Sequence, residues 1–206
     1  FDFIVLSPGI NKDVCNLKKF LLINRSKIIS DLDIFYFKNI QNLKICITGT
    51  NGKSTTSKII YKILKNAGLD ARLVGNIGQP ILNEKKITKK TVFVVEISSY
   101  QIEYSKYFKS DIAAILNIFP DHLDRHKTFS NYRKIKFKLL KNLHPGGTGL
   151  IEKNIFSNKD IKQKRTKTKI IKINSSSKNK IIDKNKTISN DMLQNFNFAI
   201  YISKLL

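Results

Sequence analysis

The chain alternates between short apolar runs and segments whose apolar residues recur at helical spacing. Two near-continuous apolar runs, residues 91–97 and 112–118, predict strands that are covered on both faces, as in a parallel sheet. A shorter run at residues 43–47 predicts another strand, and residues 59–67 predict an amphipathic helix that ends near Gly68. This alternation predicts an α/β fold built on a doubly wound, mostly parallel sheet.

The first forty residues predict a separate unit that ends in a polar connection. In chain order we expect a strand, a helix, a short strand and a helical turn, at residues 1–6, 14–22, 27–30 and 31–37. A new apolar strand follows the connection. We therefore expect two domains, residues 1–40 and residues 41–206.

The second half of the chain predicts further helices and a polar region. Helices are expected at residues 101–107, 129–143 and 190–206, the second of them ending at Pro145-Gly146-Gly147. Residues 154–189 are rich in Lys, Asn and Ser and carry brief apolar pairs such as Ile170-Ile171 and Ile181-Ile182. This composition predicts short antiparallel strands joined by solvated turns.

Composition adds one anomaly, which is charge. The 206 residues include 38 Lys+Arg against 15 Asp+Glu, a formal net charge of +23, while 41% hydrophobic residues exclude a wholly disordered chain. Such an excess raises the possibility of a polyanionic partner. However, nearly all of it is lysine, and arginine is the residue preferred for phosphate and base recognition. We therefore expect no nucleic-acid partner. The competing hypothesis is that the protein is a basic P-loop ATPase or a nucleic-acid-binding module.

Cysteine usage and hydropathy bear on the compartment. Cys15 and Cys46 are not in a CxxC spacing, so the sequence indicates neither a zinc site nor a disulfide framework. No apolar run reaches the ~18 residues of a membrane span. We expect a cytoplasmic protein without a membrane span.

A phosphate-binding loop is the strongest motif. It comprises the consecutive residues Gly49, Thr50, Asn51, Gly52, Lys53, Ser54 and Thr55, between an apolar strand and an amphipathic helix. Backbone N–H groups of such a loop face phosphates, Lys53 reaches the outer ones, and Ser54 can ligate magnesium. The loop is a variant, because Ile47 stands where the strict pattern has Gly.

Two further strands end in polar residues. Glu96 ends the run at residues 91–97, where a carboxylate is either a surface cap or a magnesium ligand beside the phosphates. The next run ends in Asn117 and leads to Asp121-His122, with Asp124 and Arg125 close behind. Since carboxyl ends of parallel strands share one sheet edge, these groups predict a charged, metal-binding edge.

Together these motifs resemble the Mur ligase family. The similar segments are Ser7-Pro8-Gly9-Ile10, residues 48–55, Gly75-Asn76-Ile77-Gly78, residues 96–103, residues 117–126, and Phe129, Tyr132 and Lys136. The resemblance implies a central ATP-binding P-loop domain at residues 41–206. Residues 1–40 would then be the C-terminal part of a Rossmann-like domain that binds the UDP-linked substrate.

The resemblance also implies an activity. Residues 96–103 are similar to the stretch that separates family members adding D-glutamate from their relatives. The expected reaction is ATP-dependent addition of D-glutamate to UDP-N-acetylmuramoyl-L-alanine through an acyl phosphate, a step of peptidoglycan precursor synthesis. ATP and Mg²⁺ are the implied cofactors, and we expect a monomer.

Residue roles follow from the resemblance in the same way. Catalytic roles fall to Lys53, His122 and Lys136, and substrate contacts to Ser7, Asn76, Ser98 and Gln101. Magnesium ligands would be Ser54, Glu96, His122 and, if carbamylated, Lys136. Asn195 aligns with an adenine-contacting residue of the family, although Asp191-Met192 replaces the His-Asn pair expected just before it.

The two ends of the chain favour a fragment. The first apolar run starts at Phe1 without a preceding Met, and the last helical pattern runs to Leu206 without a stop signal. By resemblance, most of the uridine-binding domain and all of the C-terminal domain lie outside these residues. We expect the 206 residues alone to be inactive as a ligase.

Overall fold

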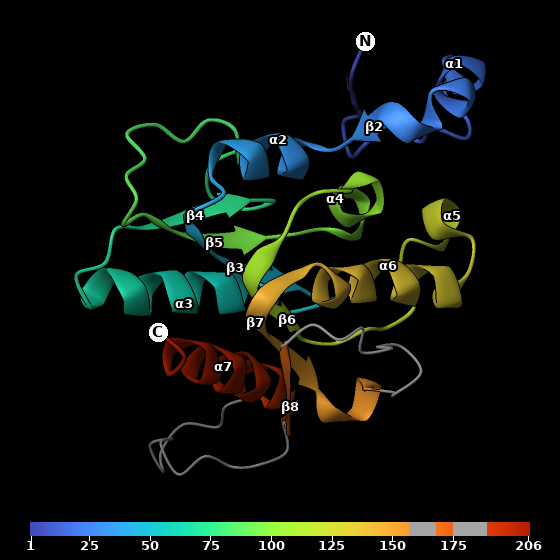
Figure 1. Ribbon diagram of the computed structural model, residues 1–206. Helices are drawn as coiled ribbons and strands as arrows, with labels where there is room; N and C mark the ends of the chain where they lie inside the picture. The colour runs from blue at the N-terminus through green and yellow to red at the C-terminus, as the bar shows by residue number, and fades with distance from the viewer. Residues whose placement is uncertain (157–167, 175–188) are drawn as a thin grey trace.

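The computed structural model describes residues 1–156, 168–174 and 189–206. Its centre is a six-stranded sheet in the order β4-β5-β3-β6-β7-β8, and every strand pair in it is parallel (Figure 1). The strands are β3 (Leu43–Thr48), β4 (Ala71–Gly75), β5 (Val92–Glu96), β6 (Ser110–Ile115), β7 (Leu143–Glu152) and β8 (Lys169–Ile173). The predicted α/β fold with a parallel sheet is confirmed.

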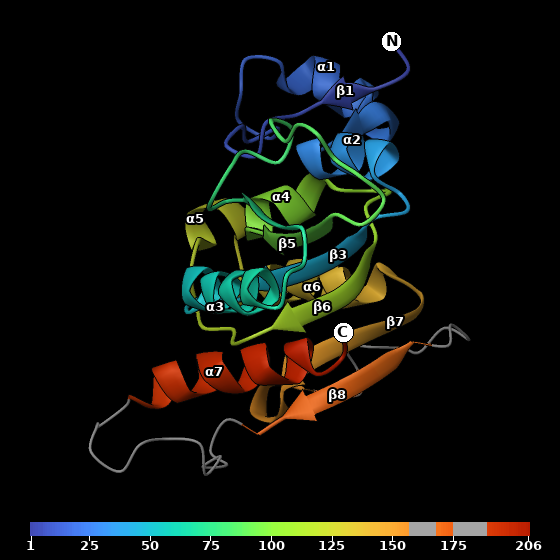
Figure 2. The same cartoon turned by 90° about the vertical axis from the view of Figure 1, so that its left-hand side faces the viewer.

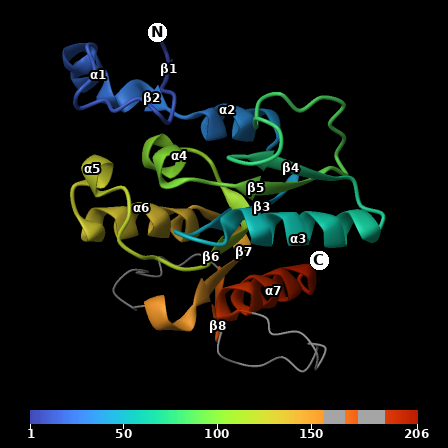
Figure 3. The ribbon, with the colours of Figure 1, turned by 180° about the vertical axis from the view of Figure 1, so that it is seen from behind.

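Helices cover both faces of this sheet because its strands are apolar on both faces. On one face α3 (Lys53–Asn66) packs beside α7 (Asn190–Ser203), and on the other α4 (Ser99–Tyr104) packs beside α6 (Phe129–Lys141) (Figures 1 and 3). Alternate residues of β3 belong to the two resulting cores. Cys46 packs in the α6 core and Ile45 in the α3 core.

The N-terminal residues form a smaller unit beside the β4 end of the sheet, and α7 with β8 lies at the opposite end (Figure 2). The unit contains β1 (Ile4–Val5), α1 (Lys18–Ile23), a 3-10 turn (Arg25–Lys27) and β2 (Ile28–Ile29), which pairs in parallel with β1. α2 (Asp31–Lys38) then leads to β3. Tyr104 of α4 shares a small core with Leu6, Leu21 and Ile28 of the unit.

Several predicted elements differ from the structure. The strand expected at residues 1–6 is reduced to two residues, and the first helix starts at Lys18 rather than residue 14. β4 and the short helix α5 (Leu123–His126) were not predicted. β7 begins directly after α6 and contains Pro145-Gly146-Gly147, where its pairing with β6 shifts register. These residues therefore lie within a strand and do not form the predicted turn.

The prediction of antiparallel strands after residue 154 is wrong where it can be compared. Ile170 and Ile171 lie in β8, which pairs in parallel with Gly149 and Leu150 of β7. An apolar pair indicates a buried strand but carries no information on its direction. The pair Ile181-Ile182 lies outside the described residues. The final helix is confirmed as α7, and a second 3-10 turn occupies Lys153–Ile155.

Candidate functional site

The phosphate-binding loop joins β3 to α3 at the carboxyl edge of the sheet. Gly52 has φ +79°, a left-handed conformation that glycine adopts without strain, directly before α3 begins at Lys53. The side-chain Oδ1 of Asn117, after β6, accepts hydrogen bonds from the backbone N–H of Thr50 (3.0 Å) and Asn51 (2.9 Å). The neighbouring strand therefore fixes the loop, and the Lys53 ammonium donates back to the Thr50 carbonyl at 2.8 Å.

Glu96 ends β5 beside this loop and is almost fully buried, with 1% of its surface exposed. Its Oε1 accepts a hydrogen bond from Asn76 Nδ2 at 3.0 Å, whereas its Oε2 has no hydrogen-bond partner among the described residues. A buried carboxylate oxygen without a donor is costly unless a cation or donor meets it. Ser54, in the first turn of α3, has a half-buried hydroxyl, and carboxylate and hydroxyl oxygens are both ligands of the kind that magnesium prefers.

Burial of the Lys53 side chain changes its pKa. Burial lowers the pKa of Lys53, while the carboxylates of Glu96 and Asp121 act in the opposite direction. The Lys53 cation therefore lies within electrostatic reach of two carboxylates that a metal would also attract. Within the described part of the chain, no cluster of three or more His, Cys, Asp or Glu side chains is poised to hold a metal ion. A metal here would need ligands of other kinds, such as hydroxyl, phosphate or water.

Lys136 lies under the loop, although it comes from the lysine-rich helix α6. Only 1% of it is exposed, and its Nζ donates to the Gly49 carbonyl at 2.8 Å and to Thr48 Oγ1 at 3.4 Å. The ammonium also lies 4.7 Å from the ring centroid of Tyr132. Burial, and then the positive charge of Lys53, lowers the pKa of Lys136 to about 7. The amine is therefore partly neutral near neutral pH.

A pocket of about 210 Å³ brings together six of the predicted site residues. It is lined by Gly49, Lys53, Asn76, Ser98, Ser99, Tyr100, His122, Tyr132 and Lys136. His122 stands at its edge with φ +52°, about four-tenths exposed at the side chain, and its ring lies 4.9 Å from that of Tyr100. The structure thus brings together the three residues predicted to be catalytic (Lys53, His122 and Lys136) and two predicted substrate contacts (Asn76 and Ser98).

Nine predicted residues do not line this pocket. Six of them lie in or beside the phosphate loop, namely Thr50, Asn51, Gly52, Ser54, Thr55 and Glu96, and the other three are Gln101, Ser7 and Asn195. Gln101 caps α4 by accepting a hydrogen bond from Ser98 N at 3.1 Å and donates to Asp31 of α2 at 3.2 Å, so it supports Ser98 rather than lining the pocket. Ser7 is exposed in the N-terminal turn. Asn195 of α7 lies against the phosphate loop, where its Oδ1 accepts from Thr56 Oγ1 at 3.1 Å.

His126 and Ser99 are site residues that the sequence analysis did not single out. His126 is buried, its Nε2 lies 3.0 Å from Ser99 Oγ, and its ring packs between Tyr100 and Tyr132. Burial lowers the pKa of His126, which favours the neutral ring. His126 therefore supports, from the protein interior, the part of the pocket wall that Tyr100 and Tyr132 form. A signal in the sequence is the spacing of four between His122 and His126, which would bring both side chains to one side of a short helix. In the structure His126 ends α5, and His122 precedes the helix in a left-handed conformation.

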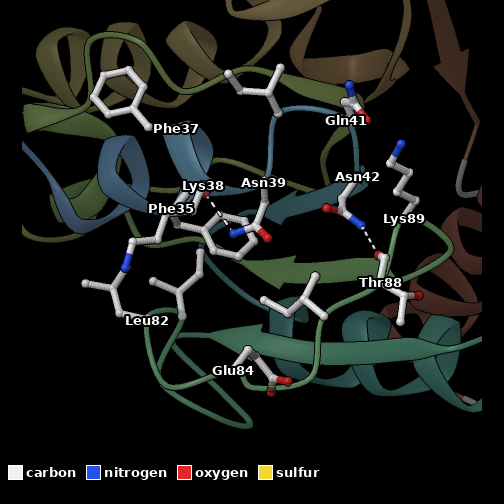
Figure 4. Close-up of a pocket in the computed structure, with 13 residues that line it drawn as sticks. Phe35, Phe37, Lys38, Asn39, Gln41, Asn42, Leu82, Glu84, Thr88 and Lys89 are labelled. Carbon is white, nitrogen blue, oxygen red and sulfur yellow. Dashed lines mark hydrogen bonds between the residues drawn. The ribbon is translucent and has the colours of Figure 1, made fainter.

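Two larger pockets flank the sheet. One of about 600 Å³ lies beyond the phosphate loop, between the end of β7 and the start of α7. It is lined by Asn51, Asn117, Phe119, Glu152, Asn154, Ile155, Asn190, Asp191, Leu193 and Gln194. Another of about 460 Å³ lies at the opposite, amino edge, between the end of α2 and residues 81–89 (Figure 4). There Asn42 donates to the Thr88 carbonyl at 2.8 Å, and no predicted site residue lines it.

Comparison with known proteins places these features in a family. The model of the Mur ligase middle domain matches residues 47–204. A UDP-N-acetylmuramoylalanine--D-glutamate ligase of Rickettsia bellii (strain RML369-C) is 39% identical over 98% of this chain and 44% of its own length. The corresponding ligase of Rickettsia conorii is 46% identical over 67% of this chain and 27% of its own length. The chain thus spans less than half of the curated relatives it matches.

Solved structures share the fold. The MurF ligase from Thermotoga maritima in complex with ADP matches 99% of this chain and 60% of its own with a TM-score of 0.65 at 14% identity. A murein peptide ligase from Psychrobacter arcticus 273-4 matches 99% of this chain and 52% of its own with a TM-score of 0.59 at 16% identity. Among the described residues, no helix has the length and apolar character to cross a bilayer. On the match of the family model to most of its residues, the chain belongs to the Mur ligase family.

Proposed function

We propose that this protein is an ATP-dependent ligase of peptidoglycan precursor synthesis that joins D-glutamate to UDP-N-acetylmuramoyl-L-alanine. The observation that carries the proposal is the pocket at the phosphate loop, which is lined by Lys53 and by the low-pKa amine of Lys136. The half-satisfied carboxylate of Glu96 accepts a hydrogen bond from Asn76 of the pocket wall. Relatives at 39% and 46% identity bear the name of that activity, which supports D-glutamate as the added residue.

The chemistry has two steps. A carboxylate oxygen of the UDP-linked substrate attacks the γ-phosphorus of ATP, the bond to the β,γ-bridging oxygen breaks, and ADP departs. The amine of D-glutamate then attacks the carbonyl carbon of the acyl phosphate, loses a proton and expels phosphate through a tetrahedral intermediate. Loop N–H groups and Lys53 bind the phosphates, so the protein contributes mainly position and charge neutralisation.

The residues present fit magnesium. Ser54 Oγ and the free Oε2 of Glu96 would hold one ion, and His122 with carbamylated Lys136 would hold a second. Bound magnesium would neutralise charge on the transferring phosphoryl group. Lys136 can serve only after its neutral amine has captured CO₂, because an ammonium repels a cation. Its lowered pKa supports this modification, since a neutral amine is the reactive form.

Substrate contacts follow from position. Asn76 and Ser98 line the pocket and are assigned to the muramoyl substrate, with Gln101 acting by holding Ser98. We assign residues 1–40, with Ser7 in their first turn, to the domain that binds the UDP moiety, and residues 41–206 to the ATP-binding domain. The protein acts as a cytoplasmic monomer on small-molecule substrates.

The test is phosphate release by the full-length gene product. We expect release from ATP to require UDP-N-acetylmuramoyl-L-alanine and D-glutamate together, with meso-diaminopimelate or lysine failing to replace D-glutamate. If only one of those other amino acids supported phosphate release, the protein would instead catalyse the reaction of a different member of the same family. Absence of substrate-dependent release would refute the proposal.

A further inference from the structure

The turn at residues 7–10 of the N-terminal unit is held by an arginine that lies three residues after His122. The backbone N–H of Ile10 donates to the Ser7 carbonyl at 3.0 Å and closes this turn. The Ile10 carbonyl in turn accepts two hydrogen bonds, from Arg125 Nη2 at 2.9 Å and from the Tyr104 hydroxyl at 2.9 Å. Donors on α4 and α5, which lie next to the N-terminal unit (Figures 1 and 3), therefore hold one end of the turn.

The guanidinium of Arg125 has a fixed environment. Only 7% of the side chain is exposed, and its Nε donates to Glu103 Oε2 at 3.0 Å. Its Cζ lies 5.3 Å from the ring centroids of both Tyr100 and Tyr104. A planar guanidinium that packs on aromatic rings and donates to a carboxylate has its remaining donors already oriented. The hydrogen bond to Ile10 is therefore directional, unlike the apolar contacts between the N-terminal unit and α4.

The same arginine is connected to the catalytic pocket. Its backbone N–H donates to the His122 carbonyl at 3.1 Å. Tyr100, against which the guanidinium packs, lines the pocket, and its ring lies 4.9 Å from that of His122. The main chain of Arg125 thus holds a predicted metal ligand, while its side chain holds the turn that carries Ser7, a predicted substrate contact. A displacement of Arg125 would change the separation of these two segments.

Polar groups of α4 complete the junction. Glu103 accepts from Arg125 through Oε2, and its Oε1 lies 3.6 Å from the Lys12 ammonium. The Tyr104 hydroxyl accepts from the Lys12 backbone N–H at 3.2 Å and from Arg125 Nη2. Residues that follow the turn and a residue of α5 therefore meet on the same two side chains, so paired polar groups specify how the turn docks.

We propose that Arg125 is a positioning residue that sets the place of the turn at residues 7–10 relative to His122, and thereby where the UDP-linked substrate presents its carboxylate to ATP. The inference rests on the proposed function, which assigns residues 1–40 to the domain that binds this substrate. In this role Arg125 acts through Ile10 and His122 and contacts no reacting atom. Its loss should affect the UDP-linked substrate and spare ATP binding.

The experiment compares the full-length gene product with its Arg125→Met variant. We expect KM for UDP-N-acetylmuramoyl-L-alanine to rise and kcat to fall, so that kcat/KM falls about ten- to a hundredfold, the worth of one hydrogen bond from a charged group. The dissociation constant for ATP should stay unchanged. A purely structural role would instead lower the thermal unfolding midpoint and leave these constants at their wild-type values.

Arg125→Lys separates geometry from charge. An ammonium can pair with Glu103 but has no planar fork with which to reach Ile10 at the same time. We therefore expect this variant to recover only part of the lost kcat/KM. Full recovery would show that charge alone suffices and would overturn the positioning role.

Arg72→Met is the matched control. Arg72 of β4 pairs with Asp70 at 2.9 Å and with Glu84 at 3.7 Å, and it lines neither the catalytic pocket nor the junction. It also loses an arginine that pairs with carboxylates. Its kinetic constants for both substrates should match the wild type.

Tyr104→Phe decides the matter if Arg125→Met does not fold. The phenylalanine ring keeps its place in the small core, whereas the second donor to Ile10 is lost. We expect KM for the UDP-linked substrate to rise about threefold or more with ATP affinity unchanged.

Two results would overturn the inference. One is wild-type kcat and KM for the UDP-linked substrate in the folded variants, and the other is an equal loss of affinity for ATP. Wild-type protein that releases no phosphate with UDP-N-acetylmuramoyl-L-alanine and D-glutamate would refute the proposed function and this inference with it. An active wild type with unaffected variants refutes only the role of Arg125.

Discussion

At the residue scale, the site depends on which charged groups are buried. The burial of an individual charged side chain is the property that is hardest to predict from the sequence. Among the described lysines, Lys44 and Lys136 are the two that are buried. Lys44 Nζ donates to the Ile40 carbonyl at 3.2 Å at the amino edge of the sheet, whereas Lys136 lies under the phosphate loop. In the sequence each is one lysine among many. The family resemblance, rather than any local pattern, pointed to Lys136.

Lys136 should react with CO₂ in a pH-dependent way. Because burial lowers its pKa to about 7, the amine is mostly charged at about pH 6 and mostly neutral at about pH 8. Protein in ¹³C-labelled bicarbonate should therefore show a carbamate signal by NMR that grows across this interval. Lys136→Arg should lack the signal. Lys138→Met, on the same helix with its ammonium at the Ile102 carbonyl, should keep it, and its loss there would contradict the assignment.

Glu96 should matter more for catalysis than for stability. Glu96→Gln preserves the shape and an acceptor for Asn76 but removes the anionic oxygen offered to magnesium. We expect ATP-dependent phosphate release to fall about a hundredfold or more, while thermal unfolding changes little.

Glu84→Gln is the matched control, because Glu84 forms a 3.7 Å ion pair with Arg72 far from the loop. Its activity should stay within about twofold of wild type. Full activity of Glu96→Gln at the magnesium concentration that saturates the wild type would contradict the metal role.

At the element scale, the sequence predicted the central strands and missed those whose pattern is weak. β3, β5 and β6 are nearly continuous apolar runs buried on both faces, which is the pattern typical of strands inside a parallel sheet. β4 is an edge strand with Arg72 as its second residue, and three of its five residues are only half-buried. β7 contains Pro145 and two glycines near its start, which locally predict a turn. Both pair correctly because tertiary contacts outweigh these local preferences.

The junction of β3 and α3 can be tested through its glycine. Gly52→Ala combines a positive φ with a Cβ placed 2.2 Å from Asn195 Oδ1. Gly68→Ala has a similar φ of +80° after α3 but nothing within 4 Å of the new Cβ.

We expect Gly68→Ala to cost about 1–2 kcal/mol of unfolding free energy, the cost of the left-handed backbone alone. Gly52→Ala should cost more and also weaken ATP binding, because α7 and the loop must separate. Equal unfolding free energies and unchanged ATP affinity would show that Asn195 does not brace the loop. Urea unfolding and a nucleotide titration provide the two readouts.

At the scale of the whole molecule, charge and topology contribute differently. The formal charge of +23 is carried mainly by lysines outside the site, and the site itself uses the buried Lys136 and the half-buried Lys53. Topology does the positioning, since the parallel sheet brings the ends of β3, β5 and β6 to one edge. That convergence could be predicted from three polar strand ends. The pocket wall formed by Ser99 and His126 could not, because it depends on how α4 and α5 pack.

A buried carboxylate of α2, the helix that connects the N-terminal unit to β3, is one of the contacts that join the N-terminal residues to the rest of the molecule. Asp33 of α2 is fully buried and accepts backbone N–H groups from Lys106 at 3.0 Å, Tyr107 at 2.7 Å and Phe108 at 2.8 Å, between α4 and β6. It also accepts from the backbone N–H of Ser30 at 2.9 Å, which caps its own helix. A single side chain therefore satisfies donors from two units of the molecule.

Asp33→Asn should consequently lower the free energy of unfolding by about 3 kcal/mol or more, because an amide offers one acceptor oxygen and presents an NH₂ group to backbone donors. Asp13→Asn is the control, since Asp13 is exposed and only pairs with Lys12 at 3.2 Å, and it should cost less than about 1 kcal/mol. Urea unfolding followed by tyrosine fluorescence measures both. If Asp33 does link the two units, its variant should also separate one cooperative transition into two; a small loss with a single transition would place the link elsewhere, in the contacts of Tyr104 and Arg125 with Ile10.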